Sequence, residues 1–272
     1  MQISIKSYVK QFSITILFLL TYVPTFIWMW DRWFARDSYY SHGILIPFVV
    51  VFLVWQKRED LASIKKISSG WGMFLIITGM LMHIFASLMR VYFISGFSML
   101  IVLVGLILFF YGFAVFKKIL FPVLFLVFMI PVPLVIITNI SFKMKIFAAK
   151  IATDILNNAG IPALREGSLI HMRNAQIVVD DVCSGLRSLI SLMALGSIFA
   201  YWMKSSIVRK YLLFIITIPI AIVTNVARII FLSSIAEIWG PKYAVGFIHD
   251  ASGFLVFALA FILLFVAGRI LE

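Results

Sequence analysis

The sequence contains a single cysteine, Cys183, among its 272 residues. One thiol cannot form an intramolecular disulfide, and it cannot build a zinc site from several cysteines. We expect neither a metal nor a cofactor. The sequence also lacks internal repeats, low-complexity segments and a glycine-rich phosphate loop, so nothing in it predicts a repeat protein or a nucleotide-binding fold.

Charged residues are scarce as well, at 12% of the chain, whereas 63% of the residues are hydrophobic. Soluble domains contain roughly 45–50% apolar residues, so this composition excludes a water-soluble fold. Apolar runs recur along the whole sequence and leave no segment of ordinary size for a separate soluble domain. We therefore expect one membrane domain that covers residues 1–272.

A span of the bilayer needs about 20 apolar residues in helical conformation. Eight segments meet or approach this requirement, at residues 12–30, 43–56, 70–89, 93–115, 119–139, 185–203, 210–233 and 252–270. The second segment is short, and the first has no small-residue cleavage site after it, so we expect it to be retained. The predicted fold is an all-α polytopic membrane protein with about eight transmembrane helices.

Basic residues exceed acidic ones by 23 to 11, which gives a formal charge of +12. They are grouped in alternate loops between the apolar runs, as the cytoplasmic loops of membrane proteins are, so we expect contact with membrane lipids and no nucleic acid. Both termini are then cytoplasmic. The stretch 140–184 lies outside, although it also carries five basic residues.

Two features are predicted within that outer stretch. Apolar residues recur at helical spacing over residues 142–158, with polar residues on the opposite side, which indicates an interfacial helix. The segment 164–182 then resembles a short hairpin with strands at 169–172 and 177–179. Upstream, the prolines of the segment 130–133 lack an N–H and must interrupt the fifth span.

Cys183 stands where the outer loop enters the sixth span, with Arg187 one helical turn later. The N-terminus of a helix and a nearby guanidinium both favour a thiolate, which is a nucleophile. The alternative is a small buried hydrophobic residue, which is how most free cysteines behave.

Two further residues lie at the outer ends of the next two spans. Arg228 is placed in the seventh span, with Asn225 three residues earlier on the same face, and the alternative role for Arg228 is a lipid anchor. His249 precedes the last span and suits proton transfer near neutral pH, although a structural role is the alternative. Together with Cys183, these residues could supply a base and a cationic oxyanion stabiliser.

Several motifs resemble those of the exosortase family, in order and spacing over nearly the whole chain. They are Tyr40-Ser41-His42-Gly43, Ile130-Pro131-Val132-Pro133, Gly160-Ile161-Pro162-Ala163 with Arg165-Glu166-Gly167, Cys183-Ser184-Gly185-Leu186-Arg187-Ser188, Asn225 with Arg228, and His249 with Ser252-Gly253.

The resemblance implies an enzyme of the bacterial inner membrane, a cysteine-dependent protease or transpeptidase whose site faces the periplasm. Its substrates would be exported proteins with a C-terminal sorting signal of the PEP-CTERM type, which consists of a short motif, a transmembrane helix and a basic tail. The catalytic residues of that family correspond to Cys183, Arg228 and His249 here. Ser184, Gly185, Arg187 and Asn225 would support them.

Other interpretations stay open on the sequence. Hydrolysis and transpeptidation differ only in the acceptor, water or an amine. A transporter or export component could use the proline-broken fifth span and Arg228 as elements of a transport path. A structural membrane protein could use the same polar residues for packing alone.

Overall fold

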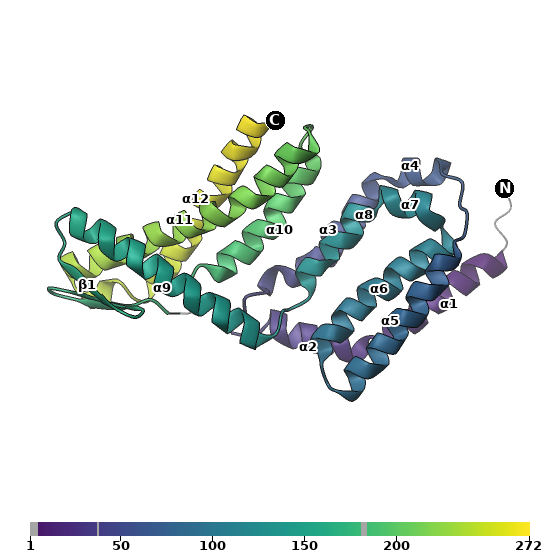
Figure 1. The fold of residues 1–272 in the computed structure, drawn as a ribbon, viewed down its shortest axis with the longest axis horizontal. Coiled ribbons are helices and arrows are strands. Elements are labelled where there is room, and N and C mark those ends of the chain that lie inside the picture. The colour runs from purple at the N-terminus through teal and green to yellow at the C-terminus, as the bar shows by residue number, and fades with distance from the viewer. Residues whose placement is uncertain (1–4, 37, 181–183) are drawn as a thin grey trace. The chain divides into compact units, whose positions relative to one another are not determined.

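The computed structural model describes residues 5–36, 38–180 and 184–272. Cys183, the predicted nucleophile, lies outside these described residues. The chain divides into two compact units, Met1–Val132 and Pro133–Glu272. Both units are built mainly of helices (Figure 1).

The first unit contains helices that account for the first four predicted spans. The first span is a bent pair, in which the helix axis turns by 57° at the break before Pro24. Proline is well tolerated at the start of a helix and poorly inside one, which explains a new helix at this position. The elements are α1 (Ile5–Thr21), α2 (Val23–Trp33), η1 (Ser41–Ile44), α3 (Leu45–Gln56), α4 (Arg58–Ser63), α5 (Gly70–Leu88) and α6 (Tyr92–Phe110).

A cluster of buried polar side chains joins α2, α5 and α6. Ser95 Oγ lies 2.6 Å from Thr25 Oγ1 and 2.8 Å from His83 Nδ1. The hydroxyl oxygen of Tyr22, Oη, lies 3.1 Å from Ser98 Oγ. Hydrogen bonds of this kind between helices stabilise membrane bundles by roughly 0.6 kcal/mol each. The polar atoms of the cluster thus satisfy one another within the bundle, which is a structural role.

The predicted break at residues 130–133 is confirmed, but the boundaries around it differ from the prediction. The expected span 119–139 ends at Met129, and its helical part, Leu120–Met129, forms a second bent pair with the preceding helix Gly112–Lys118, at an angle of 67°. The elements are α7 (Gly112–Lys118), α8 (Leu120–Phe125) and η2 (Leu126–Met129). Because Pro131 and Pro133 cannot donate a main-chain hydrogen bond, the predicted span ends before them and the residues after them begin a new helix.

The second unit begins with α9 (Leu134–Asn158), which is longer than the predicted interfacial helix over 142–158. Pro133 caps this helix, and no breaker separates residue 134 from residue 142, so one continuous helix forms. The remaining helices are α10 (Leu186–Trp202), α11 (Ile207–Trp239), η4 (Pro241–Tyr243) and α12 (Phe247–Leu271). Helices α10, α11 and α12 pack side by side, and α9 crosses one end of them (Figure 1).

A small antiparallel sheet lies next to α9 and α11, with strand order β1-β2-β3. The strands are β1 (Ala163–Glu166), β2 (Leu169–Met172) and β3 (Gln176–Val178). The predicted hairpin is confirmed as β2 and β3, which pair in the register Leu169 with Val178. Strand β1 was not predicted, because its four residues are too few for alternation to be distinguished from loop.

Apolar residues from α9, the sheet and α11 form one buried cluster. It contains Ala148, Ala149, Ala152, Leu156, Ile170, Val179, Val226 and Ile229. The alanines allow α9 to approach α11 closely, as small residues do between membrane helices. This cluster fixes the sheet against the half of α11 that carries Arg228.

Among the described residues, four helices are long and apolar enough to cross a bilayer alone, and six spans result if each bent pair counts as one. Two shorter apolar helices, Ser41–Gln56 and Leu186–Trp202, occupy the second and sixth predicted positions. The all-α polytopic membrane fold is therefore confirmed.

Candidate active site

Arg228 is buried inside the second unit, with 9% of its surface exposed. Its guanidinium is bound by two residues at the start of α12. Nε donates to Ser252 Oγ at 3.0 Å, and Nη2 donates to the main-chain oxygen of His249 at 3.0 Å. A buried guanidinium requires such hydrogen-bond acceptors, so its hydrogen-bond partners here are protein groups and a lipid headgroup is not needed.

His249 lies in the first turn of α12, which begins at Phe247. Its Nε2 lies 3.4 Å from Arg228 Nη2, and its Nδ1 lies 3.6 Å from Asp250 Oδ1. A guanidinium only donates, so an imidazole nitrogen that pairs with it must accept. This arrangement favours the tautomer with its proton on Nδ1, next to the carboxylate of Asp250.

Ser252 was not among the residues that we selected for the site. It is 2% exposed, accepts from Arg228 Nε and donates to His249 O at 2.7 Å. Gly253 follows, and a Cβ added there would lie 3.2 Å from Arg228 Nη2. Two sequence signals pointed to Ser252, its place in the motif that pairs His249 with Ser252-Gly253 and its spacing of three residues from His249, which places both on one helix face.

The start of α10 lies against the same face of α11. Gly185, two residues after Cys183, is the N-cap of α10 with φ of +80°. A Cβ at this position would lie 2.8 Å from Cγ of Asn225, and both Asn225 and Ser184 are buried. Ser184 Oγ accepts the N–H of Leu186 at 3.3 Å. Asn225, one turn before Arg228, thus contacts the segment that follows the predicted nucleophile.

Arg187 is partly buried on α10, and its Nε has no hydrogen-bond partner among the described residues. His171, another histidine of this unit, lies in β2 and pairs with Glu166 at 3.3 Å. Within the same described ranges, no group of three histidine, cysteine or acidic side chains is arranged to hold a metal ion.

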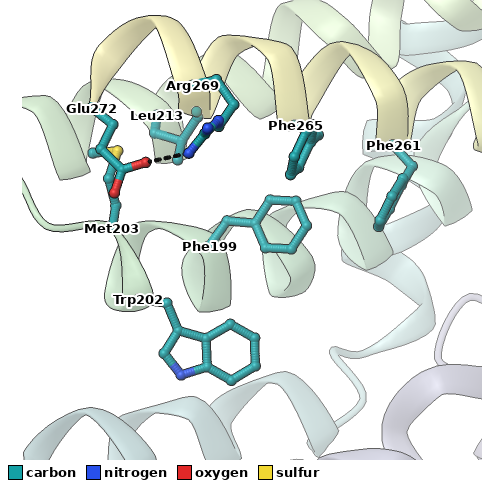
Figure 2. Close-up of a pocket in the computed structure, with 9 residues that line it drawn as sticks. Phe199, Trp202, Met203, Leu213, Phe261, Phe265, Arg269 and Glu272 are labelled. Atoms are coloured by element: carbon teal, nitrogen blue, oxygen red, sulfur yellow. Dashed lines mark hydrogen bonds and ion pairs between the residues drawn. The ribbon is translucent and has the colours of Figure 1, made fainter.

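Two cavities of the second unit differ in chemistry. A groove of about 390 Å³ contains His249 together with residues 176–180 of the sheet edge. A second cavity of about 500 Å³ is lined by aromatic residues such as Phe199 and Phe265 and by the ion pair of Arg269 with Glu272 (Figure 2).

The second cavity lies far from the polar cluster. Leu213, which lines it, precedes Arg228 by 15 residues on α11, and this separation corresponds to about 22 Å along the helix. The larger cavity is therefore not part of the candidate active site.

These features define a class of protein, a polytopic membrane protein with a buried Arg-Ser-His cluster where two of its helices meet. The family model described as transmembrane exosortase matches residues 30–266, so the chain belongs to the transmembrane exosortase family. No curated protein matches the chain. No solved structure matches it either.

Proposed function

We propose that the chain is a cysteine protease or transpeptidase that cleaves the C-terminal sorting signals of exported proteins. Cys183 is the nucleophile, His249 the acid and base, and Arg228 the oxyanion stabiliser. The observation that carries this proposal is the contact of the buried Arg228 guanidinium with His249, because 21 residues separate the two in sequence. Family membership supports the same reaction class.

The environment of Arg228 suits stabilisation of developing negative charge. Hydrogen-bond donors act most strongly on an oxyanion when they are fixed in advance and removed from water. Arg228 is buried, and the side chain of Ser252 and the main chain of His249 fix its orientation. Little reorganisation of the guanidinium is then needed during the reaction.

In the first half of the reaction, the Cys183 thiol loses its proton to His249 and the thiolate attacks the scissile carbonyl carbon. The carbonyl oxygen becomes an oxyanion that Arg228 stabilises. When the C–N bond breaks, His249 returns the proton to the leaving amine, and the acyl group remains on Cys183 as a thioester.

In the second half, water or an amine attacks the thioester carbonyl. His249 takes the proton from the attacking group and returns it to the departing sulfur. With water the product is a free carboxylate, and with an amine it is a new amide. Both outcomes use the same residues.

The proposed location follows from the distribution of basic residues. The chain lies in the bacterial inner membrane with both termini in the cytoplasm, and the site faces the periplasm. Its partners are exported proteins that end in a short motif, a transmembrane helix and a basic tail. This signal would enter the site laterally from the bilayer.

The test uses an exported protein of the same genome that ends in such a signal. Cys183→Ala should yield an inserted protein that does not process it. A His249→Ala variant should process it ~10²–10⁴-fold more slowly and should carry a hydroxylamine-sensitive adduct on Cys183 if thioester release slows more than acylation. His171→Ala is the matched control and should process normally. Full processing by Cys183→Ala would exclude the proposed mechanism.

A further inference from the structure

Strand β3 is an edge of the sheet, because it pairs with β2 alone in the order β1-β2-β3. In an antiparallel pair, residues alternate between those bonded to the partner strand and those whose N–H and C=O point away from it. The bonds Met172 N to Ala175 O and Val179 N to Ser168 O fix this alternation. It follows that Gln176 and Val178 direct their main-chain groups to the open side.

The open side of β3 has no partner in the described part of the chain. No described residue donates to, or accepts from, the main chain of Gln176 or Val178. Their side chains are exposed too, and Val178 is 54% exposed, whereas Val179 is buried in the core beneath the sheet. An exposed edge of this kind is a template for another extended strand.

This edge forms one wall of the groove of about 390 Å³ that contains His249. Its lining also includes Ile229 and Leu232 of α11, Pro241 and residues 244–246. The volume is within the usual range for ligand clefts, roughly 300–1,000 Å³. The groove therefore combines unpaired main-chain groups, an apolar lining and a candidate catalytic histidine.

We infer that the substrate segment preceding its transmembrane helix binds here as an added strand, hydrogen-bonded to Gln176 and Val178. This inference rests on the proposed function and names how that function recognises its substrate. Strand addition supplies affinity through main-chain bonds, and pockets for alternate side chains supply specificity. The bound segment should accordingly present every second side chain to Ile229 and Leu232.

A single extended peptide fits this site better than the sheet of a second copy. Edge-to-edge pairing of two sheets needs open space beside the edge. Here Pro241 and residues 244–246 line the same groove as residues 176–180, so the edge of β3 borders a groove and not open space alone. The position of His249 in the same groove also places such a peptide beside the candidate catalytic group.

The first experiment measures the bound conformation by disulfide trapping in a Cys183→Ala background. A cysteine replaces Val178, and single cysteines are placed at ten successive positions before the transmembrane helix of the substrate used above. Facing residues in paired strands have Cβ atoms about 4.5–5.5 Å apart, and diagonal neighbours two residues away are about 7–8 Å apart, so cross-linking should be strongest at one substrate position, weaker two residues to either side of it and lowest at the positions between. Leu164→Cys is the matched control, because Leu164 is 65% exposed on the opposite edge strand, and it should not cross-link.

The outcomes separate this inference from the proposed function. If the unmodified chain processes the substrate but cross-links are absent, show no difference between adjacent substrate positions, or are equal from both strands, strand addition is wrong and the protease assignment stands. Cross-links between two copies at position 178, without the substrate, would also overturn it. If the unmodified chain does not process the substrate at all, both the strand-addition inference and the proposed function are wrong.

The second experiment removes one main-chain donor. Val178→Pro deletes an N–H that makes no bond to β2, and proline is tolerated at edge strands, so the sheet should persist. Loss of one net hydrogen bond should lower kcat/KM by about 3- to 10-fold, chiefly through KM. Val178→Thr retains the N–H and the branched shape, so the difference in kcat/KM between Val178→Pro and Val178→Thr measures the contribution of the main-chain donor.

Arg165→Pro is the matched control for the proline. By the same alternation, Arg165 directs its N–H to the outer side of β1, away from β2. The Arg165→Pro substitution also removes the hydrogen bond from the Arg165 side chain to Gly167 O. Arg165→Ala removes the same bond without a proline and is therefore measured beside it. Normal processing by both Arg165 variants with a loss in Val178→Pro supports the inference, and normal processing by Val178→Pro contradicts it.

Discussion

The guanidinium of Arg228 donates to the main-chain oxygen of His249 at 3.0 Å, across the packed pair α11 and α12. The same nitrogen lies 3.4 Å from Nε2 of that histidine. One residue thus bonds both the backbone and the ring of the other. Small shifts of α12 against α11 would change both distances together, so the packing of these helices controls the geometry of the candidate site.

Replacement of Arg228 by lysine keeps a positive charge but loses the planar fork of donors. We expect Arg228→Lys to insert normally and to process substrate ~10²–10³-fold more slowly, as loss of an oxyanion donor does. Processing rates in membranes measure this effect. Arg165→Lys, at a partly exposed position of the same unit, is the control. Normal processing rates for both Arg228→Lys and Arg228→Ala would show that Arg228 has only a structural role.

Ser252 is a positioning residue for Arg228, so Ser252→Ala should lower kcat more than it raises KM. The variant leaves Arg228 Nε without its acceptor, which should cost about 1–3 kcal/mol of stability. Ser233→Ala is a matched control, because Ser233 is 0% exposed and its Oγ has no partner among the described residues. Thermal unfolding in detergent and processing kinetics should both distinguish the two variants. Equal effects would argue against positioning by Ser252.

Gly185→Ala tests the contact between the start of α10 and Asn225. An added Cβ meets the Asn225 side chain at 2.8 Å, and φ of +80° adds backbone strain. Gly160→Ala isolates the strain alone, because Gly160 has φ of +84° and no heavy atom within 4 Å of an added Cβ. We expect about 1 kcal/mol of destabilisation for Gly160→Ala and more, with loss of processing, for Gly185→Ala. If the two variants have the same stability and the same processing rate, the contact between Gly185 and Asn225 does not matter for either property.

The orientation of the chain is tested by labelling new cysteines in a Cys183→Ala background. Gly167 lies in the turn between β1 and β2, on the side predicted to be periplasmic, and Ser68 lies in a predicted cytoplasmic loop. An impermeant thiol reagent applied to cells with a permeabilised outer membrane should label a cysteine at 167 and not one at 68. The reverse pattern would invert the topology and place the candidate site in the cytoplasm.

The sequence alone was sufficient to predict the membrane class, because apolar runs near 20 residues and the grouping of basic residues between them can be read directly along the chain. Local chemistry was also readable. The prolines at 131 and 133 lack an N–H and interrupt a helix, and the turn between residues 169–172 and 177–179 predicted the pairing of β2 with β3. The resemblance to exosortases, carried by short motifs, agrees with the family that the comparison shows.

Only the tertiary structure decided which polar residues share a site. The burial of Arg228 depends on how α11 packs on α12, and Ser252 and the Nε2 atom of His249 reach it through that packing. Helix boundaries near residues 134 and 110 also escaped prediction, because continuous apolar sequence has no local signal for where a helix bends or continues. The open edge of β3 and its groove exist only because separate segments meet, and long-range contacts of this kind are not encoded in any local pattern.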